Sequence, residues 1–175
     1  MSAPLVVLLL AAASPIPLVD QWKQSDLGPV EFHKILVIGI TEHRETRHHF
    51  EEKFCSHLRG TNTECVVSYA LVPDLGRIEA EEAIKAQIIE QQIDAAITVR
   101  LVPLARGNAD VWAERWAGEL RAAPRLRSLI EESLPVSDDK SKHYGTDVGL
   151  WRVDGGDRIW AGRSDVVSRK RIKQG

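Results

Sequence analysis

The chain has 175 residues, of which 43% are hydrophobic and 27% are charged, and its formal net charge is −2. This length suits one domain with a sizeable core. The composition is typical of a soluble globular protein. The nearly balanced charge gives no general attraction for polyanions, so nucleic acid is not an expected partner.

The N-terminal segment is the longest apolar run. Leu5 to Ala13 reads LVVLLLAAA, which is too short to span a bilayer but has the length of a signal-peptide hydrophobic region. Ala11 and Ala13 supply an A-x-A cleavage pattern, so residues 1–13 are predicted to direct export and Ser14 to begin the mature protein. A mis-assigned start codon or a buried N-terminal strand is the alternative, because no Lys or Arg precedes the run.

The first part of the domain predicts two strands and a helix. An edge strand is predicted at 15–22, where prolines are tolerated, and a buried strand at Lys34–Ile40, whose apolar run suits a strand covered on both faces. The helix that follows has Phe50, Phe54 and Leu58 along one side. The intervening turn, GITEHRE, lacks the glycine spacing of nucleotide-binding loops, so no cofactor is predicted there.

The alternation continues through two further strands. They are predicted at Glu64–Val72 and Ala95–Val102, with a helix at Arg77–Ile93 between them. Because β-α-β crossovers are right-handed, we expect the three strands to be parallel, with the helices mainly on one face of the sheet.

Residues 103–142 are predicted to form a helical insert and a loop. Trp112 and Trp116 share a helix face in this insert. A stripe of this kind more often packs against its own domain, and the alternative is an interaction patch for a partner protein or a membrane surface.

The C-terminal region predicts a β-hairpin. Strands at Tyr144–Val153 and Arg158–Val167 flank the sequence DGGD, a strong turn signal. The whole pattern predicts one α/β domain at 14–168, with a mixed sheet of about five to six strands. Residues 169–175 form a basic tail, for which a frayed terminus is favoured over contact with an anionic surface.

The first helix carries the residues that invite a metal hypothesis. His48 and Glu52 are four residues apart and share a face, with Glu45 one turn earlier as a third candidate ligand. A solvated charged face is favoured instead, because the order H-E-x-x-H is missing. Glu51 is also expected on an exposed helix face.

Arg100 is the one charge inside an apolar strand. A buried charge needs a partner, so Arg100 is predicted to pair with a local carboxylate, such as Asp94 or Glu51, rather than to anchor an anionic ligand.

Cys55 and Cys65 are the two cysteines of the chain. Both are predicted to be free residues facing the core, because the geometric requirements of a disulfide are narrow. An oxidising compartment would permit the bridge. Since neither cysteine has a protease context and no G-x-S-x-G elbow occurs, no catalytic residue, cofactor or metal set is predicted.

A series of short segments extends over residues 16–165, outside the insert. They are LVDQWK, KILVIGIT, RHHFEEKF, LRGT, VVSYALVPD, IDAAITVRLV and LWRVDGGDRIWAG. Together they resemble an uncharacterised family of bacterial cell-envelope lipoproteins that is defined by a domain of unknown function. That family is similar in architecture to the N-terminal α/β domain of the translocation protein TolB. The resemblance implies protein contacts at the envelope rather than catalysis, by analogy of fold.

The chain departs from that family at three places. Ser14 stands where the family has its lipid-bearing cysteine, so a soluble periplasmic form is expected rather than a lipid anchor. Gln92 replaces the glycine where the second helix ends, at a cost of ~1 kcal/mol if that residue is left-handed. The closing helix of the family has no counterpart, so the sheet is expected to be partly uncovered or the gene truncated.

We therefore expect a non-enzymatic periplasmic or cell-envelope protein that contacts another envelope protein through a sheet edge or through Trp112 and Trp116. The alternative is a periplasmic small-molecule or metal binder that uses Arg100, His48 and Glu52.

Overall fold

The computed structural model describes residues 18–41, 43–75, 80–104 and 143–168, and in addition residues 110, 113, 114 and 117. The predicted leader, Ser14, Trp112, Trp116 and the basic tail lie outside these ranges. The helices whose bounds lie in the described ranges are α2 (Arg44–Leu58), α3 (Ser68–Leu71) and α4 (Ala80–Glu90). The strands are β1 (Leu18–Lys23), β2 (Lys34–Ile40), β3 (Glu64–Val67), β4 (Ala95–Leu104), β5 (His143–Arg152), β6 (Arg158–Ser164) and β7 (Val167–Ser168).

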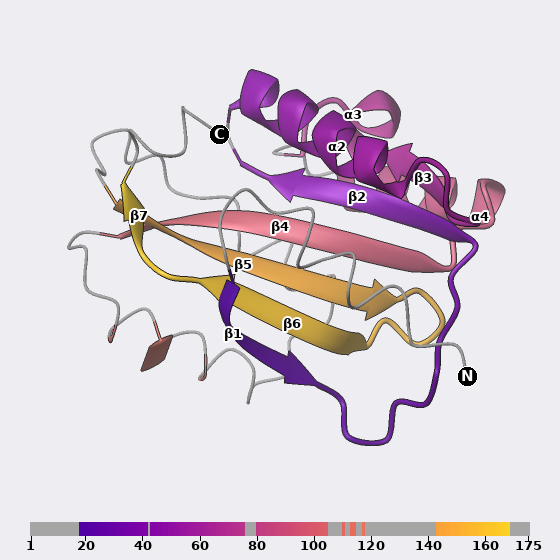
Figure 1. Ribbon diagram of the computed structural model, residues 1–175. Coiled ribbons are helices and arrows are strands. Elements are labelled where there is room, and N and C mark those ends of the chain that lie inside the picture. Colours follow the sequence, from indigo (N-terminus) through magenta and orange to yellow (C-terminus); the bar gives the residue numbers. More distant parts are fainter. Residues whose placement is uncertain are drawn as a thin grey trace.

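The strands form one mixed sheet, which confirms the predicted α/β fold. Its order is β1-β6-β5-β4-β2-β3, with the two-residue β7 also pairing with β5 (Figure 1). β2 is parallel to both β3 and β4, whereas β5, β6 and β1 are added by antiparallel pairing. The predicted hairpin is β5–β6, and its turn uses Gly155 and Gly156 at positive φ. β1 and β3 therefore lie at opposite edges of the sheet.

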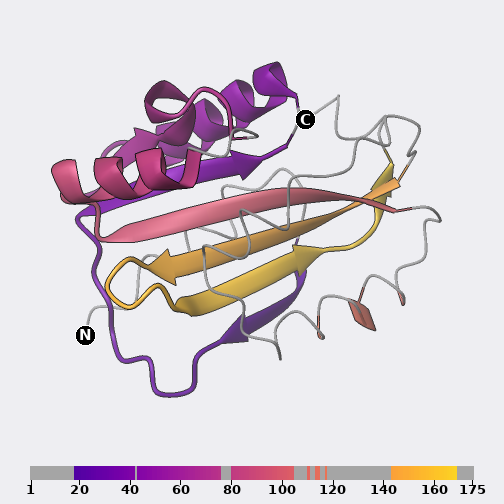
Figure 2. The same ribbon diagram turned by 180° about the vertical axis from the view of Figure 1, so that it is seen from behind.

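The helices cover both faces of the sheet, so the expectation that they lie mainly on one face is wrong. Phe54 and Leu58 of α2 pack with Ile35 and Val37, whereas Ile84 of α4 packs with the alternate β2 residues Leu36 and Ile38. Figures 1 and 2, which view the sheet from opposite sides, show α2 in front in one and α4 in front in the other. The reason is strand order: β3 and β4 lie on opposite sides of β2, so two right-handed crossovers run in opposite directions.

The second parallel strand is shorter than predicted. β3 ends at Val67, and Ser68 begins the one-turn helix α3 instead of continuing an extended strand to Val72. Both the Ser68 hydroxyl and the Tyr69 amide donate hydrogen bonds to the carboxylate of Glu51. An apolar run does not reveal this contact, which turns the chain out of the sheet.

The chain turns left-handed where α4 ends, the condition under which the sequence attached a cost to Gln92. Gln92 has a φ of 55°, and the amide of Ile93 donates to the carbonyl of Ile88, as in a helix C-terminal cap. The residue at this left-handed position is not glycine, so the strain predicted for it applies.

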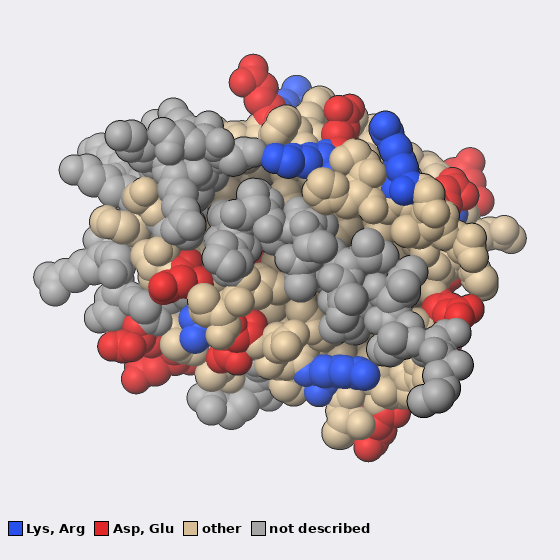
Figure 3. Space-filling view, in the orientation of Figure 1, with Lys and Arg blue, Asp and Glu red and all other residues tan. Residues whose placement is uncertain are grey.

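The described helices include none that is long and apolar enough to cross a bilayer. On the face seen in Figure 3, basic and acidic side chains are interspersed among uncharged residues.

Candidate functional site

A buried polar network joins the carboxyl ends of β2 and β3 to α2. Glu51 is 0% exposed, so the expectation that it lies on a solvated face is wrong. Its Oε1 accepts hydrogen bonds from the Gly39 amide (2.8 Å) and the Ser68 hydroxyl (2.7 Å), and its Oε2 accepts one from the Tyr69 amide (2.9 Å). The carboxylate therefore links the ends of two strands and the start of α3.

Arg47 supplies the positive charge that balances Glu51. Its Nε lies 2.9 Å from Glu51 Oε1, and one terminal nitrogen donates to Ser68 Oγ at 2.6 Å. Arg47 is 3% exposed and Ser68 is 0% exposed. Because a buried ion pair is tolerated only when its remaining polar atoms are satisfied, these hydrogen bonds are what stabilises the pair.

Gly39 makes room for this network. A Cβ at position 39 would lie 3.3 Å from Cγ of Arg47 and 3.5 Å from Oε1 of Glu51. The glycine therefore allows close approach of α2 to the end of β2.

His48 and Glu52 do share a face of α2, and Tyr69 lies against both. The rings of His48 and Tyr69 stack with their centroids 3.8 Å apart, and the Tyr69 hydroxyl donates to Glu52 Oε1. The hydrogen bond to the Glu52 carboxylate, more than burial, raises the pKa of the Tyr69 phenol above its usual value. Among the described residues no group of three His, Cys, Asp or Glu side chains could hold a metal ion.

Arg100 has a carboxylate partner, as expected, but the partner is neither Asp94 nor Glu51. Its guanidinium lies 3.0 Å from Asp147 Oδ2, on the neighbouring strand β5, where the two residues are in register. Asp94 instead accepts hydrogen bonds from the amides of His33 and Lys34.

The structure does not bring Arg100 together with His48 and Glu52. Arg100 is in register with Ile40, which packs on the α4 side of the sheet, whereas α2 covers the other side. The two parts of the predicted small-molecule or metal site are therefore on opposite faces.

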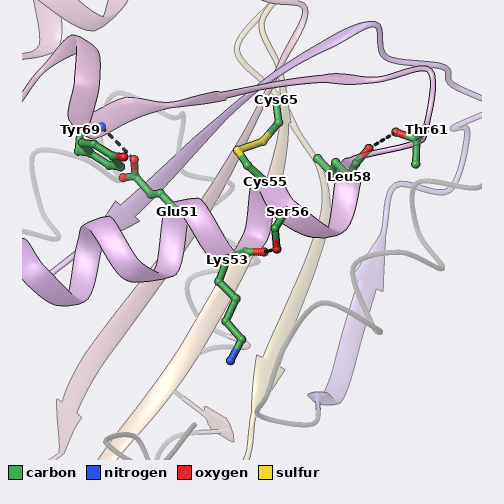
Figure 4. The surroundings of a disulfide bond; sticks show 8 residues. All are labelled: Glu51, Lys53, Cys55, Ser56, Leu58, Thr61, Cys65 and Tyr69. Atoms are coloured by element: carbon green, nitrogen blue, oxygen red, sulfur yellow. Dashed lines mark hydrogen bonds between the residues drawn. A yellow bond between two sulfur atoms is a disulfide. The ribbon is translucent and has the colours of Figure 1, made fainter.

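Cys55 and Cys65 form a disulfide, so the prediction of two free cysteines is wrong. The bond joins α2 to β3, with the two Cα atoms 5.4 Å apart (Figure 4). Parallel pairing of β3 beside β2 brings Cys65 beneath the helix, and this distance is within the range that a disulfide spans.

A groove of about 490 Å³ lies beside this disulfide. Its walls come from α2, the following turn, β3 and the start of α3. They include Glu52, Cys55, Leu58, Arg59, Thr61, Glu64, Cys65, Val67 and Tyr69. The groove therefore runs along the outer edge of the sheet.

Sequence reasoning missed Arg47 as a member of the buried polar network. The i,i+4 spacing of Arg47 and Glu51 was a usable signal for an ion pair, but spacing does not tell a buried pair from an exposed one. Trp112 and Trp116, the predicted interaction patch, lie outside the described residues, and that prediction stands as made.

The fold and the groove define an α/β protein with a disulfide-linked sheet edge. No family model matches the chain, and no curated protein matches it. Among solved structures, it is similar to a dodecamer of a PelC variant from Paraburkholderia phytofirmans, with 11% identity over 89% of this chain and 87% of that one and a TM-score of 0.44. A second PelC dodecamer from the same organism has 9% identity over 85% and 81% of the two chains, with a TM-score of 0.38. These values are too low to carry an argument about this chain.

Proposed function

We propose that this chain is an exported, non-enzymatic protein of the cell envelope that binds another envelope protein through the β3 edge. The β3 edge comprises residues 64–67 and the groove that α2 forms beside them. The partner supplies an extended strand, because the groups offered by this edge are backbone donors and acceptors.

The backbone direction of β3 is the observation that carries the proposal. The amide of Glu64 donates to the carbonyl of His33, so the backbone N–H and C=O groups of Glu64 and Val66 point towards β2. Successive residues of a strand alternate, so the amides of Cys65 and Val67 and the carbonyl of Cys65 point away from the sheet. Within the described ranges, no strand pairs with this side of β3.

Side chains beside this edge indicate the chemistry of the incoming strand. Cys65 and Val67 line the groove on the α2 side, together with Leu58. Every second side chain of an added strand would lie next to the apolar surface that these three residues form. Glu52 and Arg59, which also line the groove, are of opposite charge, and Glu64 is paired with Lys34 at 2.9 Å, so the apolar positions rather than net charge favour the partner strand.

Two observations support the export part of the proposal. Disulfides persist in oxidising compartments and are rare in the cytosol, and Cys55 and Cys65 form one. The apolar run Leu5 to Ala13 has the length and cleavage pattern of a leader.

A proline at position 67 tests the binding part. Val67→Pro removes an amide that the β2–β3 pairing does not use, and the φ of −87° at Val67 is close to the value that proline requires. The immobilised chain, its Val67→Pro variant and a Trp112→Ala/Trp116→Ala variant are each exposed to envelope extract, after equal thermal stability of the three has been checked. We expect the proteins held by the parent chain to be retained by the tryptophan variant and lost from Val67→Pro.

Retention of every partner by Val67→Pro would contradict a contact at the β3 edge. Loss from the tryptophan variant alone would place the contact on the insert instead.

Cell fractionation tests the export part. Thiols are alkylated before lysis, and the mass of the envelope form is measured. We expect a chain that begins at Ser14 and carries no alkyl group on Cys55 or Cys65. A cytosolic chain with two alkylated cysteines would contradict export.

A further inference from the structure

The Cys55–Cys65 disulfide is less buried than a disulfide in the centre of a hydrophobic core. Both cysteines are partly buried, and both line the open groove along β3. Figure 4 shows the bond between α2 and β3. Accessible disulfides are more labile than fully buried structural ones, and this partly buried pair is accessible from the groove.

Contacts other than the disulfide hold the same elements in place. Beyond Val67, the Glu51 carboxylate ties α2 to the start of α3. Before β3, the Thr63 hydroxyl donates to the carbonyl of Phe32, and Lys34 pairs with Glu64 at 2.9 Å. Between these points β3 pairs with β2 over four residues.

The C-terminal part of α2 is also anchored independently. Phe54 and Leu58, which flank Cys55 in sequence, are 6% and 7% exposed and belong to the core cluster on that face of the sheet. Opening the disulfide therefore leaves α2 and β3 attached to the sheet.

We propose that Cys55–Cys65 is a thiol–disulfide exchange site, reduced in the folded protein by a thioredoxin-like dithiol oxidoreductase. One thiolate of the reductant attacks a sulfur of the pair, which gives a mixed disulfide and releases the other cysteine as a thiolate that takes up a proton. The second thiol of the reductant then attacks the mixed disulfide. Two electrons pass to this chain, which becomes a dithiol, and the reductant becomes a disulfide.

The exchange changes one wall of the groove. The cross-link between α2 and β3 is replaced by two thiol groups, so the groove is free to widen. If the partner strand of the proposed function binds at this edge, the redox state of the pair sets its affinity. The exchange itself rests only on the geometry of the oxidised chain, so it can be tested without any partner.

The dependence of reduction on denaturant tests whether the folded protein is the substrate. The purified oxidised chain is treated with dithiothreitol at several urea concentrations below its unfolding transition. Free thiols are then alkylated, and the fraction of reduced chain is measured by mass spectrometry. If reduction required global unfolding, its rate would rise at least about fivefold per molar urea, following the unfolding equilibrium. We expect a change of less than about twofold per molar, with the far-ultraviolet circular dichroism of the folded protein retained after reduction.

Acceleration of reduction in step with unfolding would overturn the proposal.

A second experiment tests the class of reductant. A thioredoxin whose resolving cysteine is replaced by serine is mixed with the oxidised chain, and the Cys55→Ser/Cys65→Ser variant serves as the control. We expect a mixed disulfide that maps to Cys55 or Cys65 and is missing from the control. Failure to trap it, while the same reagent traps a known substrate, would exclude this class of partner.

Discussion

Glu51 and Arg47 form a buried pair whose charges balance each other at the ends of the parallel strands. Removal of one partner leaves the other charge buried without compensation. The resulting loss of stability exceeds the net stabilisation that the pair itself provides. Here the remaining guanidinium would face the Ser68 hydroxyl and the carbonyl of Pro73 alone.

We therefore expect Glu51→Ala to lower the free energy of unfolding by about 3–5 kcal/mol in urea denaturation. Glu45→Ala, at an exposed site in the first turn of the same helix, should cost less than about 1 kcal/mol. Similar losses in the two variants would show that the buried network does not stabilise the domain.

The environment of Tyr69 predicts that the stability of the folded protein depends on pH in the alkaline range. The hydrogen bond from Tyr69 to the Glu52 carboxylate raises the pKa of the phenol above the usual value of about 10. The folded-state pKa exceeds the unfolded-state pKa, so the stabilising contribution is fully present below the unfolded value and is lost as pH rises through the folded value.

The chain has two tyrosines, so Tyr144→Phe leaves Tyr69 as the only phenol in an ultraviolet absorbance titration. In that background we expect a midpoint above about 10, and a lower one when Glu52→Gln is added. A midpoint that Glu52→Gln leaves unchanged would contradict the assigned cause.

At the scale of elements, the disulfide is a short-range link between α2 and β3. The two cysteines are separated by 10 residues, so the bond closes a small loop. Cross-linking stabilises mainly by restricting the unfolded chain, and a loop of this length corresponds to about 2–3 kcal/mol.

Cys55→Ser/Cys65→Ser should therefore remain folded and lose about 2–3 kcal/mol of unfolding free energy. The reduced parent chain should match it in the same urea titration. If the double variant is unfolded at neutral pH, the other contacts between α2, β3 and β2 are too weak to hold this edge.

At the scale of the whole molecule, the sheet has a core on each face. The α4 side contains Leu36, Ile38 and Trp151, and Ile84 of α4 closes it with 3% of its surface exposed. Ile89 lies on the same helix and is 79% exposed. The two isoleucines form a matched pair for testing which side of α4 faces the sheet.

Ile84→Ala should cost about 2–5 kcal/mol, since it removes buried methyl groups and leaves a cavity, and Ile89→Ala should change stability by less than about 0.5 kcal/mol. Urea unfolding followed by tryptophan fluorescence and by circular dichroism is the measurement. An Ile89→Ala cost equal to that of Ile84→Ala would contradict the packing of α4 against the second face.

The spacing of apolar residues along the chain, together with short turn sequences, explains which parts of the fold were predictable. The unbroken apolar run of β2, the four-residue spacing of Phe50, Phe54 and Leu58, and the DGGD turn each depend only on near neighbours in sequence. The structure places β2, α2 and the β5–β6 hairpin there, with small differences in their bounds. The spacing of His48 and Glu52 likewise placed them on one helix face, but Tyr69, which contacts both, is 17 residues beyond Glu52.

By itself, the sequence determined the α/β class, the parallel strands at its centre and the C-terminal hairpin, because each follows from the pattern of residues close together in the chain. Only the tertiary structure decided that the helices cover opposite faces, that Glu51 is buried, that Arg100 pairs with Asp147 and that the cysteines are bonded. These features depend on strand order and register, which bring together residues that no local pattern relates.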